Sequence, residues 1–335
     1  MEALRRSKLS RDFVIGQSHK TTRPILQAPL GSLTSPELVA AVSGAGGIGS
    51  LALTWTNPAA AAELVARVKA LTPAPFMANF VLSFKPLALT AALEAGVPIL
   101  TFSWGLPGAL VRTAHSFGAA VGVQVSTVEG AQRALDSGSD FIICQGIEAG
   151  GHVQSSTPLR ELLHAVIASA KGVPVVAAGG LGDGADIAEV IAMGASAAML
   201  GTRFVASAES LAHPAYKASL LAAGKADTVL TGCFDGGWPY ALHRVLRNAT
   251  LTAWESSGSA PVGSRPGEGD VVVTTLSGEV IRRYSDMPPV SQMKGDPLAC
   301  CLYAGTGVGK IKEVRPAGDL VKDLWASALL ALGSP

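Results

Sequence analysis

Short apolar runs alternate with amphipathic stretches between residues 24 and 204. Eight runs rich in Val, Ile, Leu, Ala and Phe recur at intervals of roughly 20 to 33 residues, a spacing typical of strand–helix units. Most of these runs are almost continuously apolar, which is typical of parallel strands buried on both faces. The predicted strands are residues 24–30, 46–53, 76–81, 98–104, 120–126, 140–146, 173–180 and 197–204.

Patterns with a helical period lie between these runs. Several begin at a Ser, Thr, Asn or Asp suited to cap a helix N-terminus, and end on Gly. The predicted helices are residues 35–46, 57–72, 85–96, 107–118, 127–138, 157–172 and 183–195. This alternation predicts an α/β fold, a (β/α)8 TIM barrel. A doubly wound open sheet is the alternative, and the number of strand–helix units favours the barrel.

The rhythm changes after about residue 205. Residues 213–224 are predicted to form the eighth helix, and turn-rich segments and a last helix at 318–333 follow. We therefore expect a barrel domain over residues 1–224 and an extension over residues 225–335. This extension is expected to be mostly helical, to cap the barrel mouth on the substrate side and to return in part to the barrel.

Composition narrows the class of protein. The chain has 335 residues, 48% of them hydrophobic and 15% charged, which fits a large buried core. Its net charge of +1 is scattered, which argues against nucleic acid or an anionic membrane as the main partner. No apolar run reaches the roughly 18 residues of a membrane span, and residues 1–14 lack the apolar core of a secretory signal. Four cysteines without a CxxC pair favour a cytoplasmic location.

One histidine lies in a glycine-rich loop after the sixth predicted strand, in the stretch ICQGIEAGGHVQSST (143–157). In a barrel this loop belongs to the face that carries active sites. Gly150 and Gly151 leave room for a flat ligand against the backbone, and Gln145 can donate and accept hydrogen bonds. His152 is thus a candidate acid or base near neutral pH, against the alternative of a purely structural histidine. Glu148 is interpreted as a turn or capping residue.

Glycine turns follow the seventh and eighth strands, at Gly179–Gly180 and Gly201–Thr202. Loops at these two positions of a barrel commonly bind phosphate through backbone N–H groups. Arg203 is expected either to neutralise the phosphate or to pair with a carboxylate. Two glycine turns without a ligand are the alternative. The glycines at 44–49 precede a strand instead of following one, so they predict a tight turn and no nucleotide site. No metal-ligating set is found in the sequence.

Three elements, QGIEAGGH (145–152), AAGGLGDG (177–184) and GTRF (201–204), occur in this order. This combination resembles the FMN-dependent nitronate monooxygenases, formerly called 2-nitropropane dioxygenases, and the resemblance covers most of the chain. It implies one non-covalent FMN across the C-terminal face of the barrel, with His152 beside the substrate as the catalytic residue. The implied FMN contacts are Ala28, Asn79, Gln124, Gln145, Gly150, Gly151, Gly179, Gly180, Gly201 and Thr202, together with Met199 and Leu200 through their backbones.

The implied reaction converts an alkyl nitronate and O2 into a carbonyl compound and nitrite, without NAD(P)H. The resemblance also leaves alternatives open. An NAD(P)H-dependent flavin enoyl-acyl-carrier-protein reductase carries similar elements, but usually has Glu where Gln145 stands. An NADH:quinone reductase on the same fold is a further oxidoreductase. A barrel that binds a phosphate ligand without redox chemistry belongs to another class. A homodimer is one oligomeric state that the sequence allows, and both detoxification and a biosynthetic pathway are open as the physiological role.

Overall fold

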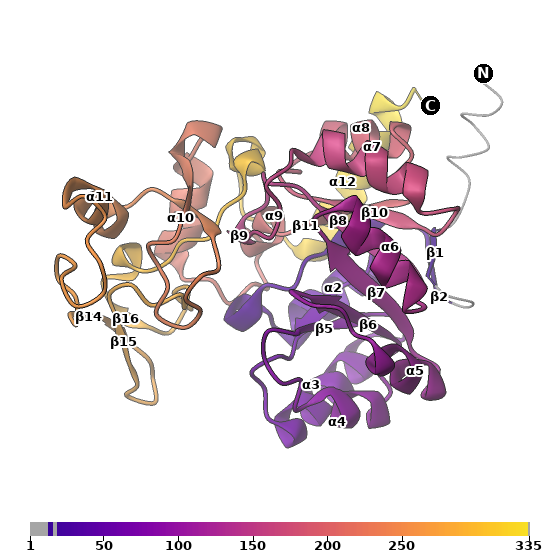
Figure 1. Ribbon diagram of the computed structural model, residues 1–335, viewed down its shortest axis with the longest axis horizontal. Coiled ribbons are helices and arrows are strands. Elements are labelled where there is room, and N and C mark those ends of the chain that lie inside the picture. Colours follow the sequence, from indigo (N-terminus) through magenta and orange to yellow (C-terminus); the bar gives the residue numbers. More distant parts are fainter. Residues whose placement is uncertain (1–12, 16–18, 334–335) are drawn as a thin grey trace.

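The computed structural model describes residues 13–15 and 19–333, and its larger part is a barrel of parallel strands (Figure 1). Each of the eight strands falls within its predicted run, so the TIM-barrel prediction is confirmed. Residues 1–12, which carry most of the segment used to argue against a signal peptide, lie outside the described residues. The strands are β3 (Ile25–Gln27), β4 (Ser50–Ala52), β5 (Met77–Val81), β6 (Ile99–Ser103), β7 (Ala120–Val125), β8 (Phe141–Gln145), β10 (Val175–Ala178) and β11 (Ala197–Leu200).

The barrel closes between its first two strands through backbone and side-chain hydrogen bonds. The N–H of Gln27 donates to the carbonyl of Ile48 at 2.9 Å. Where the two strands diverge, the fully buried Gln27 side chain replaces the missing ladder bonds. Its Oε1 accepts from the N–H of Ser50 at 2.8 Å, and its Nε2 donates to the Ser50 carbonyl at 3.2 Å. The sheet is therefore closed on itself, which excludes the open doubly wound alternative.

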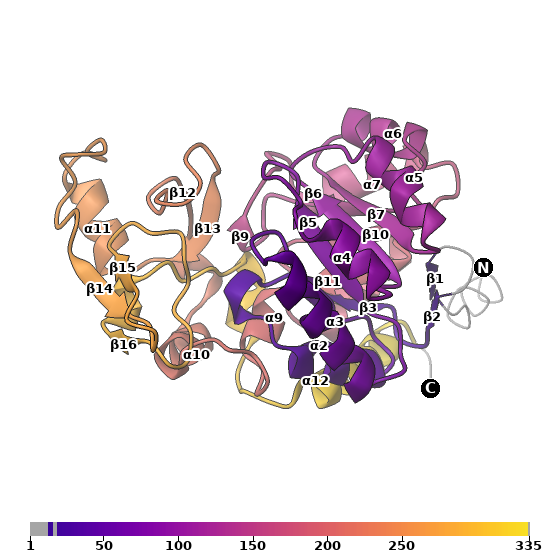
Figure 2. The same ribbon diagram turned by 90° about the horizontal axis from the view of Figure 1, so that it is seen from below.

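Apolar side chains pack on both faces of the barrel strands, inside the barrel and between the strands and the helices. One cluster, which includes Leu26, Met77 and Phe141, fills the interior. Gly122 makes room for the Phe141 ring, since a Cβ there would lie 2.7 Å from its Cε1. A larger cluster lies between the outer strand faces and the helices. The helices surround the strands (Figure 2). These helices are α2 (Pro36–Gly44), α3 (Pro58–Leu71), α4 (Leu89–Glu94), α5 (Ala109–Ser116), α6 (Val128–Asp136), α7 (Leu159–Ser169) and α8 (Gly184–Ala192).

The eighth helical position is filled by the end of the chain. Helix α12 (Ala317–Ala331) packs against both α8 and α2. A Cβ at Gly184 would lie 2.5 Å from the Cβ of Ser327, so α8 and α12 approach closely. The predicted helix at 213–224 exists as α10 (Pro214–Ala222), preceded by the short α9 (Thr202–Val205). Helix α10, however, packs against the segments at Pro297–Ala299 and Thr306–Lys310 of the extension. Its assignment as the eighth barrel helix was therefore wrong.

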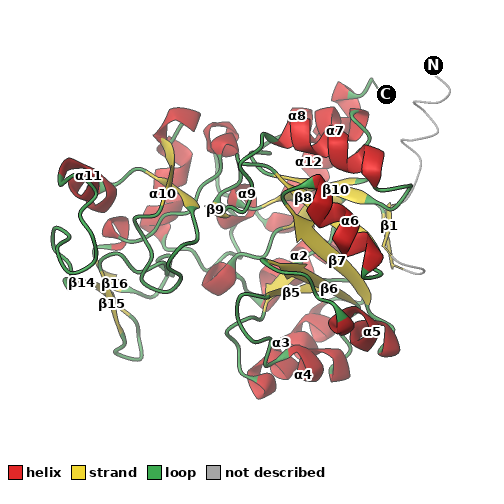
Figure 3. Ribbon diagram, viewed as in Figure 1, coloured by secondary structure: helices red, strands yellow, loops and turns green. Residues whose placement is uncertain are grey.

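The cap, defined here as residues 228–303, lies on one end of the barrel (Figure 3). It contains less helix than expected, because its short apolar runs are interrupted by Gly and Pro turns. Its regular elements are β12 (Thr228–Thr231), β13 (His243–Leu246), α11 (Ala249–Ser256), β14 (Val271–Thr274), β15 (Val280–Arg282), β16 (Lys294–Gly295) and the one-turn η3 (Pro297–Ala299). Strand β13 also pairs with β9 (Gly151–His152) of the barrel loop. No helix in the described ranges is long and apolar enough to cross a membrane.

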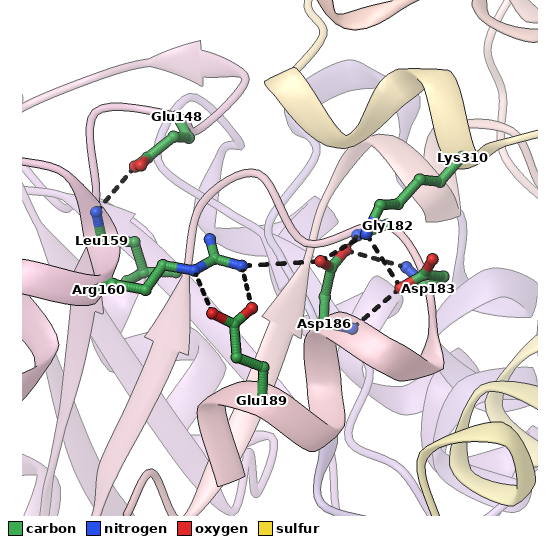
Figure 4. A network of polar contacts seen from close by, with 8 residues as sticks. All are labelled: Glu148, Leu159, Arg160, Gly182, Asp183, Asp186, Glu189 and Lys310. Atoms are coloured by element: carbon green, nitrogen blue, oxygen red, sulfur yellow. Dashed lines mark hydrogen bonds and ion pairs between the residues drawn. The ribbon is translucent and has the colours of Figure 1, made fainter. Parts of the chain in front are cut away.

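From the cap the chain returns to the barrel through residues 304–310, which are called the return segment here and include the 3-10 turn η4 (Thr306–Lys310). Lys310 donates to Asp186 at 2.6 Å and to Asp183 at 3.2 Å, at the start of α8 (Figure 4). Burial alone would raise the pKa of Asp186, but Lys310 and the N–H of Gly182 hold it below its ordinary value. The return segment is thus fastened to α8 by charge.

Replacing Lys310 by Met should destabilise the protein by about 1 kcal/mol at pH 7, because the buried Asp186 carboxylate loses its hydrogen-bonded cation and keeps the more distant Arg160, whose Nη2 lies 3.7 Å from Oδ1. A carboxyl group with a lowered pKa in the folded state contributes stability above its ordinary pKa of about 3.9, and that contribution is lost as the pH falls further. The difference between the variant and the wild type in urea unfolding should therefore shrink below about pH 4.

Lys312→Met is the matched control, since Lys312 is exposed and forms no ion pair within the described part of the chain. An equal loss of stability in the control, or a Lys310→Met effect that persists in acid, would contradict the assigned pair.

Candidate active site

A cavity of about 930 Å³ lies at the C-terminal ends of the barrel strands, between the barrel and the cap. Barrels of this kind carry their active sites at this face. All but one of the residues expected to contact a cofactor or substrate line this cavity. They are Ala28, Asn79, Gln124, Gln145, Gly150, Gly151, His152, Gly179, Gly180, Met199, Gly201 and Thr202.

Leu200 is the exception among the predicted residues. Its side chain belongs to the cluster between the strands and the outer helices, because successive residues of a strand face opposite sides. Its carbonyl accepts from the N–H of Ala28 at 2.9 Å, across the junction of β11 and β3. Leu200 is therefore a core residue behind the cavity, and Met199 is the residue of this pair that faces it.

His152 reaches the cavity because its loop is paired as a strand with the cap. In the antiparallel pair of β9 and β13, His152 lies opposite His243 and Gly151 opposite Arg244. The Nε2 atom of His152 is buried and has no hydrogen-bond partner among the described residues. Burial, and then the neighbouring His243, lower the pKa of His152 to about 3. The imidazole is thus neutral at physiological pH, and its buried Nε2 has no partner in the part of the chain that the structure describes.

His243 has the opposite character. Its Nε2 accepts from the N–H of Phe234 at 3.1 Å, and its Nδ1 lies 3.0 Å from the carbonyl of Ala241. This network assigns the proton to Nδ1. His243 is fully buried, and its two bonds close the loop that carries Trp238. It is a structural residue.

The loop that carries His152 is held by two side chains, Gln145 from the barrel and Arg244 from the cap. Gln145 accepts from the N–H of Gln154 at 2.9 Å and donates to the carbonyl of His152 at 3.3 Å. Arg244 donates to the carbonyl of Ile147 at 2.9 Å from the cap side. The amide of Gln145 therefore orients the loop, a role that the sequence did not indicate.

A second network extends from Gln154 across the cavity floor. Its Oε1 accepts from Nε2 of Gln124 at 2.9 Å and from the N–H of Trp104 at 3.2 Å. Trp104 has φ of 56°, a left-handed conformation that a large side chain rarely adopts. The Gln154 amide therefore supports a strained backbone that directs the Trp104 ring.

Aromatic rings form one wall of the cavity beside His152. The ring centroids of Trp238 and Tyr303 lie 4.6 and 5.5 Å from that of His152. Trp238 also contacts Trp104, at 4.5 Å between ring centroids, and Phe84, at 5.2 Å. The wall thus joins barrel loops to the cap.

Two glycines of the predicted ligand site, Gly150 and Gly180, line the cavity and also adjoin the return segment. A Cβ at Gly150 would overlap the backbone of the return segment, 2.7 Å from the carbonyl carbon of Ala304. A Cβ at Gly180 would lie 2.7 Å from Oγ1 of Thr306. Both glycines therefore admit the return segment. The interpretation that they admit a ligand missed this segment, which lies about 125 to 155 residues further along the sequence.

Gly151 differs from Gly150. It has φ of 78° and no atom within 4 Å of an added Cβ, so the space beside it is open. Gly179 has φ of 123°, which also requires glycine. At the eighth strand, Oγ1 of Thr202 accepts from the N–H of Gly305 at 3.0 Å, which leaves the hydroxyl hydrogen free to donate.

Two side chains near the predicted phosphate turns point elsewhere. Arg203 is buried and donates to the carbonyl of Glu313 at 2.9 Å, so it meets neither of the two expectations. Burial lowers its pKa. Glu148 accepts from the N–H of Leu159 at 2.9 Å, at the start of α7 (Figure 4). Of the two roles considered for Glu148, turn residue and capping residue, this contact agrees with capping.

Several site residues were missed in the sequence: Trp104, Gln154, Trp238, Asp286 and Tyr303. Trp104 ends a predicted strand and Gln154 follows His152 by two residues, so both lay within segments already singled out. Trp238, Asp286 and Tyr303 come from cap loops whose path no local pattern indicates.

The sequence matches the protein family described as nitronate monooxygenase over residues 14–90 and 87–327. The chain belongs to this family. Membership in the nitronate monooxygenase family makes it an oxidoreductase and sets aside the non-redox barrel.

Individual relatives agree with this assignment. The chain is 29% identical to a nitronate monooxygenase of Pseudomonas aeruginosa, with 90% of this chain and 95% of the relative covered. Its fold is similar to that of nitroalkane oxidase from Streptomyces ansochromogenes, with 30% identity, a TM-score of 0.75 and coverage of 93% and 97%. FabK from Thermotoga maritima is also similar, with 29% identity, a TM-score of 0.79 and coverage of 93% and 94%.

The adjacent glycines Gly150 and Gly151 offer a matched test of the return segment. Gly150→Ala should destabilise the protein strongly, by about 2 kcal/mol or more, because its methyl group overlaps backbone that cannot move independently. Gly151→Ala should cost about 1 kcal/mol, the cost of a left-handed alanine, because its methyl group meets open space. Urea unfolding measures both. Equal losses would show that the packing of the return segment does not decide the stability at this point.

Proposed function

We propose that this protein uses FMN to oxidise alkyl nitronates with O2, forming a carbonyl compound and nitrite. The observation that carries the proposal is His152, whose unpaired Nε2 is buried at the wall of a large cavity on the active face of a family barrel. Two nitronate ions and one O2 balance two carbonyl products and two nitrite ions, so no NAD(P)H is needed.

The residues present fit FMN. A cavity of about 930 Å³ lies at the upper end of the range of small-molecule pockets, and exceeds what a small nitronate alone would need. The turns at Gly179–Gly180 and Gly201–Thr202 border it, and the first N–H groups of α9 have no helical partner. Together with the free hydroxyl hydrogen of Thr202, they would hold the phosphate by neutral donors. Ala28, Asn79, Gln124, Gln145, Gly151 and Met199 would border the rest of the cofactor.

When bound, FMN supplies the electron transfer between nitronate and O2. His152 would hold the nitronate beside it through a hydrogen bond from its neutral imidazole. An unpaired buried polar atom costs about 1–3 kcal/mol, which an oxygen of the substrate would relieve. A histidine with a pKa of about 3 is a weak base at neutral pH. The site therefore favours nitronates that are already ionised over neutral nitroalkanes.

A second candidate is an NAD(P)H-dependent flavin enoyl reductase or quinone reductase. It is favoured by the similarity to FabK of Thermotoga maritima, with a TM-score of 0.79. Because it needs a reduced nicotinamide to start turnover, the two candidates differ in a requirement that a single assay can test.

Purified protein should consume O2 and release nitrite when given propyl 1-nitronate without NAD(P)H. It should be yellow, and heat-released cofactor should co-elute with FMN in chromatography. Oxygen-electrode traces and a colorimetric nitrite assay measure the reaction, with a parallel sample that receives NADH or NADPH and crotonyl-CoA or a quinone. Yellow protein that oxidises NAD(P)H and leaves nitronate unchanged would transfer the assignment to the reductase.

His152→Ala should retain FMN and lower kcat/KM for propyl 1-nitronate about 10- to 100-fold, because a hydrogen bond to a charged group contributes about 1.5–3 kcal/mol. Steady-state kinetics of FMN-loaded protein measures the change. His164→Ala, at an exposed position of α7, is the control and should keep full activity. Unchanged turnover in His152→Ala would remove His152 from the catalytic role.

A further inference from the structure

The cavity carries a negative charge and no positive one. Among the described residues that line it, none is Lys or Arg, and Asp286 is the one carboxylate. An alkyl nitronate is itself an anion, so a carboxylate in the wall would repel it. A site that bound only simple alkyl nitronates would not be expected to contain one. The charge of Asp286 therefore points to a further group on the substrate.

Asp286 is set firmly against the aromatic wall. A Cβ at Gly237 would lie 2.7 Å from Cγ of Asp286, so the carboxyl group packs directly on the backbone that precedes Trp238. The hydroxyl of Tyr303 donates to the Asp286 carbonyl at 2.7 Å. Both aromatic residues neighbour His152. The carboxylate is thus positioned within reach of a substrate held at His152.

Asp235, another carboxylate of the cap, is neutralised by an arginine, whereas no described residue neutralises Asp286. Asp235 receives two hydrogen bonds from Arg265, at 2.6 and 2.7 Å. Asp286 takes part in no ion pair within the described ranges. Burial, and then the charge of Asp235, disfavour its ionised form and raise its pKa. A cation in the cavity would offset both effects. The partner that Asp286 lacks in the chain is therefore expected from the ligand.

The rings around Asp286 suit the same ligand. Trp104, Trp238 and Tyr303 line the cavity, and the first two pack at 4.5 Å between centroids. Faces of Trp and Tyr attract ammonium groups within about 6 Å, most strongly where water is excluded. An aromatic wall with one carboxylate is a recognised environment for such cations.

We propose that the substrate is a nitronate that also carries an ammonium group, with the nitronate at His152 and the ammonium at Asp286 and the aromatic wall. This inference rests on the proposed nitronate oxidation and adds the class of substrate. Asp286 selects the substrate by charge and takes no part in the chemistry.

Three nitronates of equal length test the inference in the FMN-loaded enzyme: 3-ammoniopropyl 1-nitronate, butyl 1-nitronate and propionate 3-nitronate. The wild type should prefer the ammonium compound, with kcat/KM about tenfold or more above the neutral one, and should use the carboxylate least. In Asp286→Asn the kcat/KM ratio of the ammonium compound to the neutral one should fall about tenfold. Retained FMN and an unchanged urea midpoint report correct folding of this variant.

Glu279→Gln removes one negative charge from the cap surface outside the cavity, so its order of preference should match that of the wild type. A wild-type preference for the carboxylate, or an ammonium preference that survives Asp286→Asn, would overturn the inference.

Failure of the proposed function gives a different result, in which no nitronate is oxidised. Binding then decides the inference separately, by quenching of tryptophan fluorescence with butylammonium and with butyrate. Tighter binding of butylammonium that is lost in Asp286→Asn would support it. Equal affinities would overturn it.

Discussion

The active face depends on a contact between two stretches of backbone that lie far apart in the sequence, residues 148–150 and the return segment. The N–H of Thr306 donates to the carbonyl of Glu148 at 3.0 Å. A Cβ atom at Gly150 or at Gly305 would push these two segments apart, because each would overlap the backbone of the other segment. Because the loop is fixed here, β9 can pair with β13, and the cap is held to the barrel at His152.

This arrangement explains why one polar atom is left without a partner. Around His152 the loop amides and carbonyls are satisfied by Gln145, Arg244 and the cap strand. The imidazole is surrounded by rings instead, and its Nε2 is unpaired. A rigid loop with one unsatisfied group keeps that group ready for a ligand, at a cost in stability that the surrounding packing offsets.

The sequence predicted the barrel well and the cap poorly, for a physical reason. Each barrel strand is an apolar run buried by its immediate chain neighbours, so local pattern and fold agree. The eighth helical position is decided by long-range packing: α10 and α12 have similar local patterns, and only α12 meets α8. Apart from Leu200, the residues that the resemblance implied line one cavity, but the packing of the return segment against Gly150 and Gly180 could not be predicted from the local sequence.

The two halves of the cavity consequently divide its tasks. The barrel side consists of strand ends and glycine turns, whose shape follows from the closed sheet and suits a cofactor common to a family. The cap side supplies Trp238 and Asp286 from loops, and Tyr303 from a segment that pairs with β13 of the cap at Val245. Such loops change without disturbing the barrel. The chemistry is thus expected to belong to the barrel face with His152, and the choice of substrate to the residues of the cap.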